Sequence, residues 1–282
     1  MYNLTDNELL QYISDDVPYF DLTTYLQDKG DKRAVLSIFT REDIIVSCTE
    51  EVKRITELLN CKITKSHNSK ASLAKGDTVL EFEGLYGDVH KAWRACQILL
   101  EYSCKISTYT NNMKKKIEEV NSSCELLTTR KSFPFAKKFS IKAIMIGGAM
   151  PHRLGLSETI LLFPQHRSVY KNQEEFLDAI KEFKVKAPEK KVVVETEEFE
   201  DAVTLMKNGA DALQVDKVEL DVLKNIVDYK NLHFPNVKIL AAGGINLNNV
   251  DEYAKTGING VVTSAMYNCG MANLGSRMKI LN

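Results

Sequence analysis

The chain has 282 residues, of which 44% are hydrophobic and 27% charged, values that are ordinary for a folded soluble protein. Its 37 basic and 38 acidic side chains leave a formal net charge of −1 at pH 7. No global excess of positive charge points to nucleic-acid binding, so any anion site must be a local basic cluster. The length allows one large or two modest domains.

The first ten residues are polar and mixed in charge, unlike a secretory signal peptide, and no apolar run reaches the roughly 18 residues of a membrane helix. None of the six cysteines forms a C-x-x-C pair, and no histidine completes a zinc pattern. We interpret the cysteines as reduced, mostly buried thiols. A cytoplasmic protein without membrane or nucleic-acid partners is expected.

The first hundred residues predict a small sheet covered by helices. Residues 33–46 alternate apolar and polar side chains and predict a strand pair, and residues 49–60 have helical spacing with Thr49 as N-cap. Two further strands are expected near 61–66 and 78–83. A long helix is then expected from about 87 to 120, and the basic run near its end is interpreted as a solvated helix face.

After residue 122, short apolar runs alternate with amphipathic stretches. The runs lie at 126–127, 160–163, 192–194, 212–215, 237–240 and 260–262. The helical stretches lie near 136–146, 173–184, 197–208, 217–230 and 246–256. This alternation predicts parallel strands with crossover helices, either as a doubly wound sheet or as an open barrel, between which periodicity does not choose.

In parallel α/β folds, ligands bind where the strands end and their following loops begin. The residues after the apolar runs are Arg130 and Lys131, then Glu195, Asp216, Gly243 with Gly244, and Ser264 with Ala265. A glycine pair that opens a helix can wrap an anion, and paired carboxylates suit ribose hydroxyls or a hydrated Mg²⁺. Any one of these residues alone is best explained as a cap or turn, but five positions in register indicate a site.

A glycine-rich segment, residues 147–156, carries the adjacent pair His152 and Arg153. Arginine can hold a phosphate or carboxylate through two parallel hydrogen bonds. The alternative for this segment is a surface turn with incidental charge. The alternative for Glu195 and Asp216 is a structural salt bridge to Arg130 or Lys131.

These motifs, in this order and spacing, resemble the type II phosphoribosyltransferases, whose best-known member is quinolinate phosphoribosyltransferase. The likeness begins at Asp21-Leu22-Thr23-Thr24 and runs almost to the end of the chain. The resemblance implies an α/β protein with an N-terminal α+β open sandwich domain, residues 1–106 with 270–282 returning to it. It implies an incomplete, open α/β barrel over residues 107–269, and a homodimer in which one subunit's N-terminal domain closes the other's barrel.

The resemblance also implies roles for single residues. Lys131, Glu195 and Asp216 would be catalytic, and the two acids would hold Mg²⁺ directly or through water, with 5-phosphoribosyl 1-diphosphate (PRPP) as co-substrate. Arg94 would cross the dimer interface. The substrate-binding positions implied are Arg94, Arg130, His152, Arg153, His166, Gly243, Gly244, Ser264 and Ala265.

Two departures from the quinolinate enzymes stand out. Phe163 and Pro164 replace a lysine and an aspartate, so a cation that would hold an acidic substrate or the diphosphate is missing. Lys105 stands where the family usually has glycine. Leu156-Ser157-Glu158-Thr159 together with Phe163 and residues 165–167 resembles one branch of the family, the ModD proteins, named for an association with molybdate transport genes.

We therefore expect an enzyme that transfers the phosphoribosyl group of PRPP to an unidentified nitrogen acceptor and releases pyrophosphate. The alternative is a non-catalytic binding or regulatory protein for a phosphorylated metabolite or an oxyanion such as molybdate. The replacement of a lysine by Phe163 favours this alternative, because catalysis could be lost with the lysine. A quinolinate enzyme of NAD synthesis is disfavoured by Phe163 and Pro164.

Overall fold

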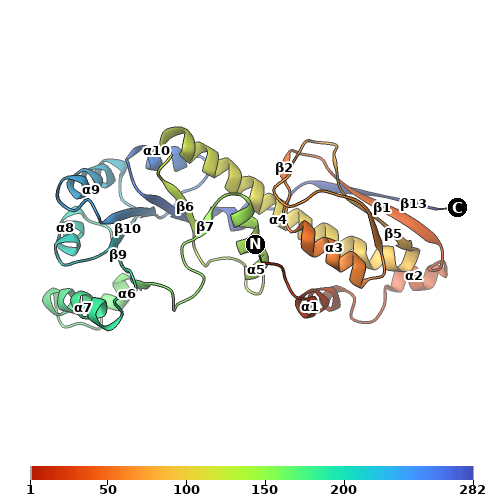
Figure 1. Cartoon of the computed structure of the whole chain (residues 1–282), viewed down its shortest axis with the longest axis horizontal. Helices are drawn as coiled ribbons and strands as arrows, with labels where there is room; N and C mark the ends of the chain where they lie inside the picture. The colour runs from red at the N-terminus through yellow and green to blue at the C-terminus, as the bar shows by residue number, and fades with distance from the viewer. Residues whose placement is uncertain (1, 282) are drawn as a thin grey trace. The chain divides into compact units, whose positions relative to one another are not determined.

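The computed structural model describes residues 2–281, which form two compact units. The first unit comprises residues 2–111, 132–148 and 266–281, and the second comprises 112–131 and 149–265. Compared with the division expected from the sequence, residues 132–148 are the notable addition to the first unit. Both units contain helices packed on a sheet (Figure 1).

The first unit is built on a four-stranded antiparallel sheet with the order β13-β1-β5-β3. Its strands are β1 (Arg33–Thr40), β3 (Lys62–Ser66), β5 (Thr78–Leu85) and β13 (Leu274–Ile280). Alternate residues of β1 point into the core, so Ala34, Leu36 and Ile38 are buried. Because β13 pairs with β1, the C-terminal segment belongs to this unit, as the resemblance implied.

Five helices belong wholly or in part to this unit. They are α1 (Asp6–Asp16), α2 (Leu22–Gln27), α3 (Thr49–Leu58), the first part of α4 (Tyr86–Val120) and α5 (Lys137–Ile146). The short segment η1 (Ala265–Asn268) lies where the chain returns to this unit. The apolar stripes of α3 and α4 bury Val52, Ile55, Cys96 and Leu100 against the sheet.

Two expectations for this unit are wrong in detail. Residues 33–46 do not form a strand pair, since β2 (Ile44–Ile45) pairs with β4 (Ser72–Leu73) in a separate ladder. Thr49 is not the N-cap of α3 but its first helical residue, and its backbone N–H donates to Ser69 Oγ at 3.3 Å. Cys48 occupies the cap position in the left-handed conformation, with φ of 59°.

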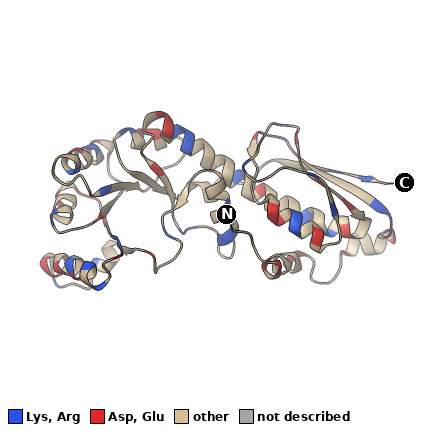
Figure 2. Cartoon of the chain, viewed as in Figure 1, with Lys and Arg blue, Asp and Glu red and all other residues tan. Residues whose placement is uncertain are grey.

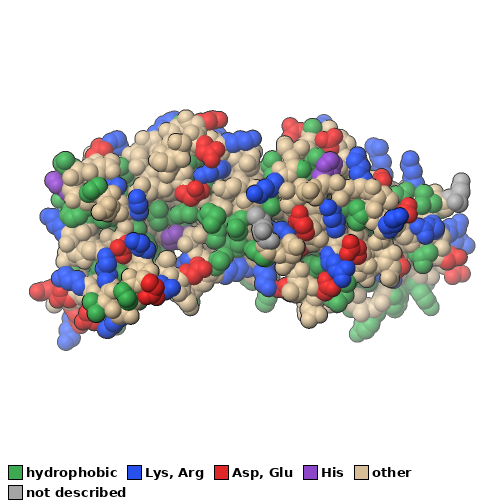
Figure 3. All heavy atoms as spheres, viewed as in Figure 1, with side chains coloured by type: hydrophobic (Ala, Val, Ile, Leu, Met, Phe, Trp, Pro, Cys, Tyr) green, Lys and Arg blue, Asp and Glu red, His purple; other side chains and the backbone are tan. Residues whose placement is uncertain are grey.

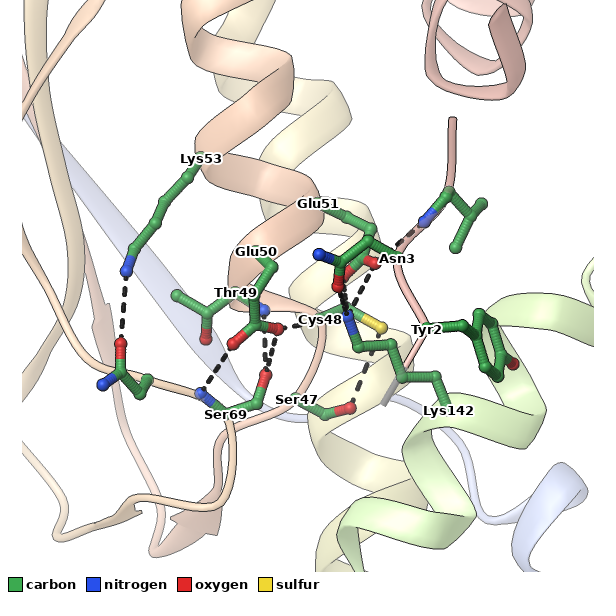
Figure 4. A network of polar contacts seen from close by, with 12 residues as sticks. Tyr2, Asn3, Ser47, Cys48, Thr49, Glu50, Glu51, Lys53, Ser69 and Lys142 are labelled. Carbon is green, nitrogen blue, oxygen red and sulfur yellow. Dashed lines mark hydrogen bonds and ion pairs between the residues drawn. The ribbon is translucent and has the colours of Figure 1, made fainter. Parts of the chain in front are cut away.

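The segment 132–148 is held in the first unit by a buried ion pair (Figure 4). Lys142 Nζ lies 2.7 and 2.8 Å from the two carboxylate oxygens of Glu51, and both residues are only 1% exposed. The same ammonium group lies 3.2 Å from Glu50 Oε2 and donates to Asn3 Oδ1 at 3.1 Å. The contacts join α5 to α3 and to the segment before α1.

Gly147 secures the other end of α5. A β-carbon at this position would lie 2.6 Å from the Ser107 carbonyl oxygen and from Thr110 Cβ, both on α4. Because glycine has no β-carbon, α5 and α4 can pack closely at this point, and a larger residue would not fit. Gly147 is therefore a packing residue, and the glycine-rich segment recognised in the sequence is only in part a ligand loop.

The second unit is built on a seven-stranded, all-parallel sheet with the order β7-β6-β12-β11-β10-β9-β8. The strands are β6 (Glu125–Thr128), β7 (Met150–Pro151), β8 (Ile160–Leu162), β9 (Val192–Thr196), β10 (Ala212–Asp216), β11 (Lys238–Ala242) and β12 (Gly260–Thr263). From β8 the order runs through β12 to β6 and β7 without reversal, whereas a doubly wound sheet reverses direction. Since β7 does not pair with β8, this is an open barrel.

The crossover helices of this unit follow the strands along the chain. They are α6 (Pro164–Arg167), α7 (Gln173–Lys186), α8 (Phe199–Lys207), α9 (Leu220–His233) and α10 (Val250–Lys255). The six predicted strands are all present. The two-residue strand β7 was missed, because it lies inside the glycine-rich segment and has no apolar run of its own.

The surface carries both signs of charge. Figure 2 shows basic and acidic residues mixed along α3 and at the end of α4, and the face seen in Figure 3 shows the same mixture in each unit. Of the cysteines, Cys269 is half-buried and the other five are buried free thiols, as expected. Among the described helices, none combines the length and the apolarity needed to cross a bilayer.

Candidate active site

A pocket of about 570 Å³ lies in the second unit at the carboxyl ends of its parallel strands. It brings together nine of the residues singled out from the sequence. These are Arg130, Lys131, His152, Arg153, Glu195, Asp216, Gly243, Gly244 and Ser264. Since all of them lie at the carboxyl ends of strands or in the loops that follow, the pocket forms where parallel α/β folds bind their ligands.

Basic residues gather where β6 and β7 end. Arg130 and Lys131 follow β6, and His152 follows β7. The backbone N–H of His152 donates to the Thr128 carbonyl at 2.9 Å. Burial, with help from the neighbouring Arg153, lowers the pKa of His152 and so favours its neutral imidazole. Burial and Arg130 likewise lower the pKa of Arg153. An anion placed here would relieve the repulsion between the two guanidinium groups.

Two carboxylates stand at the ends of the adjacent strands β9 and β10. Burial raises the pKa of Glu195, and the charges of Asp216 and Glu197 add to this effect. Gln214, the cross-strand neighbour of Glu195, opposes the rise by donating from Nε2 to Glu195 Oε2 at 2.5 Å. Asp216 Oδ2 lies 3.0 Å from Lys217 Nζ. The alternative of structural salt bridges to Arg130 or Lys131 is therefore wrong for both acids.

Glu195 is held from behind by an arginine that the sequence did not single out as a site residue. Arg167, at the end of α6, donates to the Glu195 carbonyl oxygen at 2.6 Å and makes two 3.0 Å hydrogen bonds to the carboxylate of Asp201. Thr196 Oγ donates to the same carboxylate at 2.6 Å. This bidentate pair fixes the end of β9 and so the position of Glu195.

The glycine pair forms the floor next to the acids. Gly243 and Gly244 have φ values of 89° and 71°, in the region that favours glycine. A β-carbon on Gly243 would lie 2.3 Å from Lys217 Cγ and 2.9 Å from Asp216 Oδ1, whereas one on Gly244 would meet open space. The loop after β12 is braced separately, since Thr263 Oγ donates to the Ile245 carbonyl at 2.6 Å and accepts the Ala265 N–H at 3.1 Å.

The wall at β8 is apolar. Leu161 and Phe163 line the pocket, and the guanidinium carbon of Arg153 lies 5.9 Å from the centre of the Phe163 ring. The resemblance to the quinolinate enzymes implies a lysine at position 163, which lies at this wall. A cation–π contact takes its place.

Three of the expected site residues do not line this pocket. Arg94 is exposed on α4 in the first unit, with its guanidinium 5.3 Å from the centre of the Trp93 ring. His166 is exposed, accepts the Phe163 N–H at Nδ1 over 3.0 Å and stacks on the Phe163 ring. Ala265 lies just beyond Ser264, the last lining residue.

Sequence reasoning missed Gln214 and Lys217, which both line the pocket. Gln214 is the polar member of an otherwise apolar run, and this was the signal that could have marked it. Lys217 directly follows the strand-end acid Asp216, but nothing in the sequence indicated that its side chain turns back toward that acid.

The residues present fit a magnesium ion only in company with a ligand. Among residues 2–281, no three side chains of the metal-binding types His, Cys, Asp and Glu come together as a metal site. Two carboxylates, Glu195 and Asp216, face the same pocket. Mg²⁺ is commonly held by one or two carboxylates with substrate phosphates and water, so these two could serve with a phosphorylated substrate.

Comparison with known proteins agrees with this geometry. Residues 21–104 match the family model of the quinolinate phosphoribosyl transferase N-terminal domain, and residues 106–271 match that of the C-terminal domain. A ModD protein of Pasteurella multocida is 30% identical over 267 residues, which are 95% of this chain and 95% of the relative.

Solved structures show the same fold. The nicotinate-nucleotide pyrophosphorylase of Ehrlichia chaffeensis is 17% identical with a TM-score of 0.90, covering 99% of this chain and 100% of that one. NadC from Streptococcus pyogenes is 21% identical with a TM-score of 0.88 over 100% of both chains. With its strand-end site, its open barrel and both family domains in order, the chain belongs to the quinolinate phosphoribosyltransferase family, a family of pentosyltransferase enzymes.

Proposed function

We propose that this enzyme transfers the phosphoribosyl group of PRPP to a nitrogen acceptor and releases pyrophosphate. The observation that carries the proposal is the pocket itself: two carboxylates face a basic cluster across a glycine-lined floor. This arrangement suits a ligand with a polar, cation-forming sugar in the middle and phosphate groups at its ends. An oxyanion alone would not need the paired carboxylates.

In the proposed reaction the bond between the sugar C1 and the diphosphate oxygen breaks, and its electron pair leaves with pyrophosphate. The acceptor nitrogen supplies the electron pair of the new bond to C1. The sugar passes through a cation-like state, which Glu195 and Asp216 would stabilise, while Lys131, Arg130 and Arg153 would balance the charge of the departing diphosphate. No nucleophilic side chain is required, because the protein acts by positioning and by charge.

Mg²⁺ belongs to the proposal as a partner of the diphosphate. Bound to phosphate oxygens and to Glu195 or Asp216, it would neutralise charge on the leaving group. Glu195 must be ionised for this, and its raised pKa therefore makes the reaction sensitive to acid. Gln214 favours the ionised form through its hydrogen bond to the Glu195 carboxylate.

The acceptor is proposed to differ from a pyridine dicarboxylate. Phe163 and Leu161 give the pocket an apolar wall where the quinolinate enzymes place a lysine. A dicarboxylate would lose a charge-assisted contact there, whereas an aromatic acceptor with less negative charge would gain packing.

The first test is titration calorimetry of the protein with PRPP and Mg²⁺, with Arg153→Ala measured alongside. Micromolar binding that the variant loses, followed by pyrophosphate release with a screened nitrogen heterocycle, is expected. Binding of molybdate or another oxyanion, without any binding of PRPP by a folded protein, would instead favour the regulatory alternative.

We also propose a homodimer in which Arg94 of each subunit reaches the pocket of its partner. Supporting this are the resemblance and the position of Arg94, which is exposed and lines no part of the pocket in its own chain. The Arg94→Ala and Arg153→Ala proteins should each be inactive, but their subunits mixed in equal amounts should regain about a quarter of the wild-type activity. Random mixing makes about half of the dimers mixed, and each mixed dimer has one complete site of two. Failure to regain activity in demonstrated mixed dimers would contradict the shared site.

A further inference from the structure

The pocket holds a cation whose role the family resemblance leaves unassigned. We propose, resting on the proposed function, that Lys217 binds phosphate oxygens of the substrate. Lys217, at the end of β10, would supply a positive charge in place of the lysine that Phe163 replaces at the end of β8. Two lines of evidence carry this: the distribution of charge around the pocket and the way the chain places Lys217.

The charge distribution is one-sided without Lys217. Along the sheet, the lining residues Arg130, Lys131, His152 and Arg153 follow the neighbouring strands β6 and β7. At the opposite end, the strands β8, β9 and β10 offer Phe163, Glu195 and Asp216. Arg153 reaches the Phe163 ring at the β8 wall, but beside the carboxylates that end β9 and β10 the basic lining residue is Lys217. An anion bound next to Glu195 and Asp216 would otherwise meet two negative charges and the neutral amide of Gln214.

The backbone conformation of Lys217 directs its side chain over Gly243. Its φ of 53° lies in the left-handed region, which is uncommon for a residue with a side chain. Its N–H donates to the Ala242 carbonyl of the neighbouring strand at 3.0 Å. Its side chain passes over Gly243 so closely that a β-carbon there would come within 2.3 Å of Lys217 Cγ. The glycine thus provides the space that lets the side chain turn back over the pocket.

The ammonium group is available to a ligand. It lies 3.0 Å from Asp216 Oδ2, and the Lys217 side chain is still 73% exposed. An ammonium group has three N–H donors, so two remain for phosphate oxygens while Asp216 keeps the third. Asp216 thereby holds the lysine in place and keeps a hydrogen-bonding oxygen of its own for the sugar.

The test is binding of inorganic pyrophosphate and of ribose 5-phosphate by calorimetry in metal-free buffer. Lys217→Met should weaken binding of at least one probe on the order of tenfold, because a charge-assisted hydrogen bond is lost, whereas Lys217→Arg should retain most of the affinity. The affected probe identifies which phosphate the lysine holds. Lys255→Met is the matched control, since Lys255 makes the same 3.0 Å contact to an aspartate, Asp251, outside the pocket.

A second variant separates a direct contact from simple neutralisation of Asp216. If Lys217 binds phosphate itself, Lys217→Met combined with Asp216→Asn should stay as weak as Lys217→Met alone. Recovery of wild-type affinity in the double variant would overturn the proposal, as would equal binding of both probes by Lys217→Met and the wild type. A wild-type protein that binds neither probe, nor PRPP with Mg²⁺, would remove the proposed function first.

Discussion

Gly243 and Gly244 provide a matched pair of substitutions in one loop. Both residues have positive φ, of 89° and 71°, so alanine at either position should cost about 1–2 kcal/mol of backbone strain. They differ in their surroundings. A β-carbon at Gly243 would lie 2.3 Å from Lys217 Cγ and 2.8 Å from the Lys217 nitrogen, but at Gly244 it would meet nothing within 4 Å.

The added contact at Gly243 requires the Lys217 segment to move, because ordinary contacts begin near 3.4 Å. Overpacking of this kind costs about 1–3 kcal/mol, so Gly243→Ala should lose that much more unfolding free energy than Gly244→Ala. Urea denaturation followed by circular dichroism measures both losses. Equal losses for the two variants would refute the view that Gly243 makes room for Lys217.

Three further predictions concern charge. Lys142→Met should cost about 3–5 kcal/mol of unfolding free energy, because it leaves the buried Glu51 carboxylate without its cation. Adding Glu51→Leu should recover much of that loss in denaturation experiments, and additive losses would contradict the pairing. Gln214→Leu removes a hydrogen bond that favours ionised Glu195, so the pKa of Glu195 should rise further. The acidic limb of the reaction rate measured against pH should therefore move to higher pH. An acidic limb that stays in place or moves to lower pH would contradict this role of Gln214. Phe163→Lys should tighten binding of a pyridine dicarboxylate on the order of tenfold in calorimetry, whereas Phe163→Leu should not.

Much of the second unit could be predicted from local pattern. Apolar runs of parallel strands are short, and their carboxyl ends meet at one edge of a sheet, so residues following the runs must come together. This is why Glu195, Asp216 and the glycine pair could be named without coordinates. The same reasoning could not reach residues that act from outside the strand ends, such as Arg167 behind Glu195.

Side-chain direction decided which nearby residues join the pocket. His166 lies between two residues with contacts to the site, yet its imidazole caps the turn at Phe163 and stays outside. Lys217 turns toward the pocket because its backbone adopts the left-handed conformation beside Gly243. Neither orientation follows from residue type, since His166 is held by the local turn at Phe163 and Lys217 is placed by Gly243, which is distant in the chain.

The sequence alone determined the strand–helix alternation, the positions of the strand-end residues and the family resemblance, because each depends on order and spacing along the chain. Only the tertiary structure decided between a doubly wound sheet and an open barrel, since strand order is set by pairings between distant segments such as β12 and β6. It likewise decided that residues 132–148 belong to the first unit, where Lys142 finds Glu51 about ninety positions earlier in the chain. Burial of both charges makes that distant pairing necessary, and no local pattern shows it.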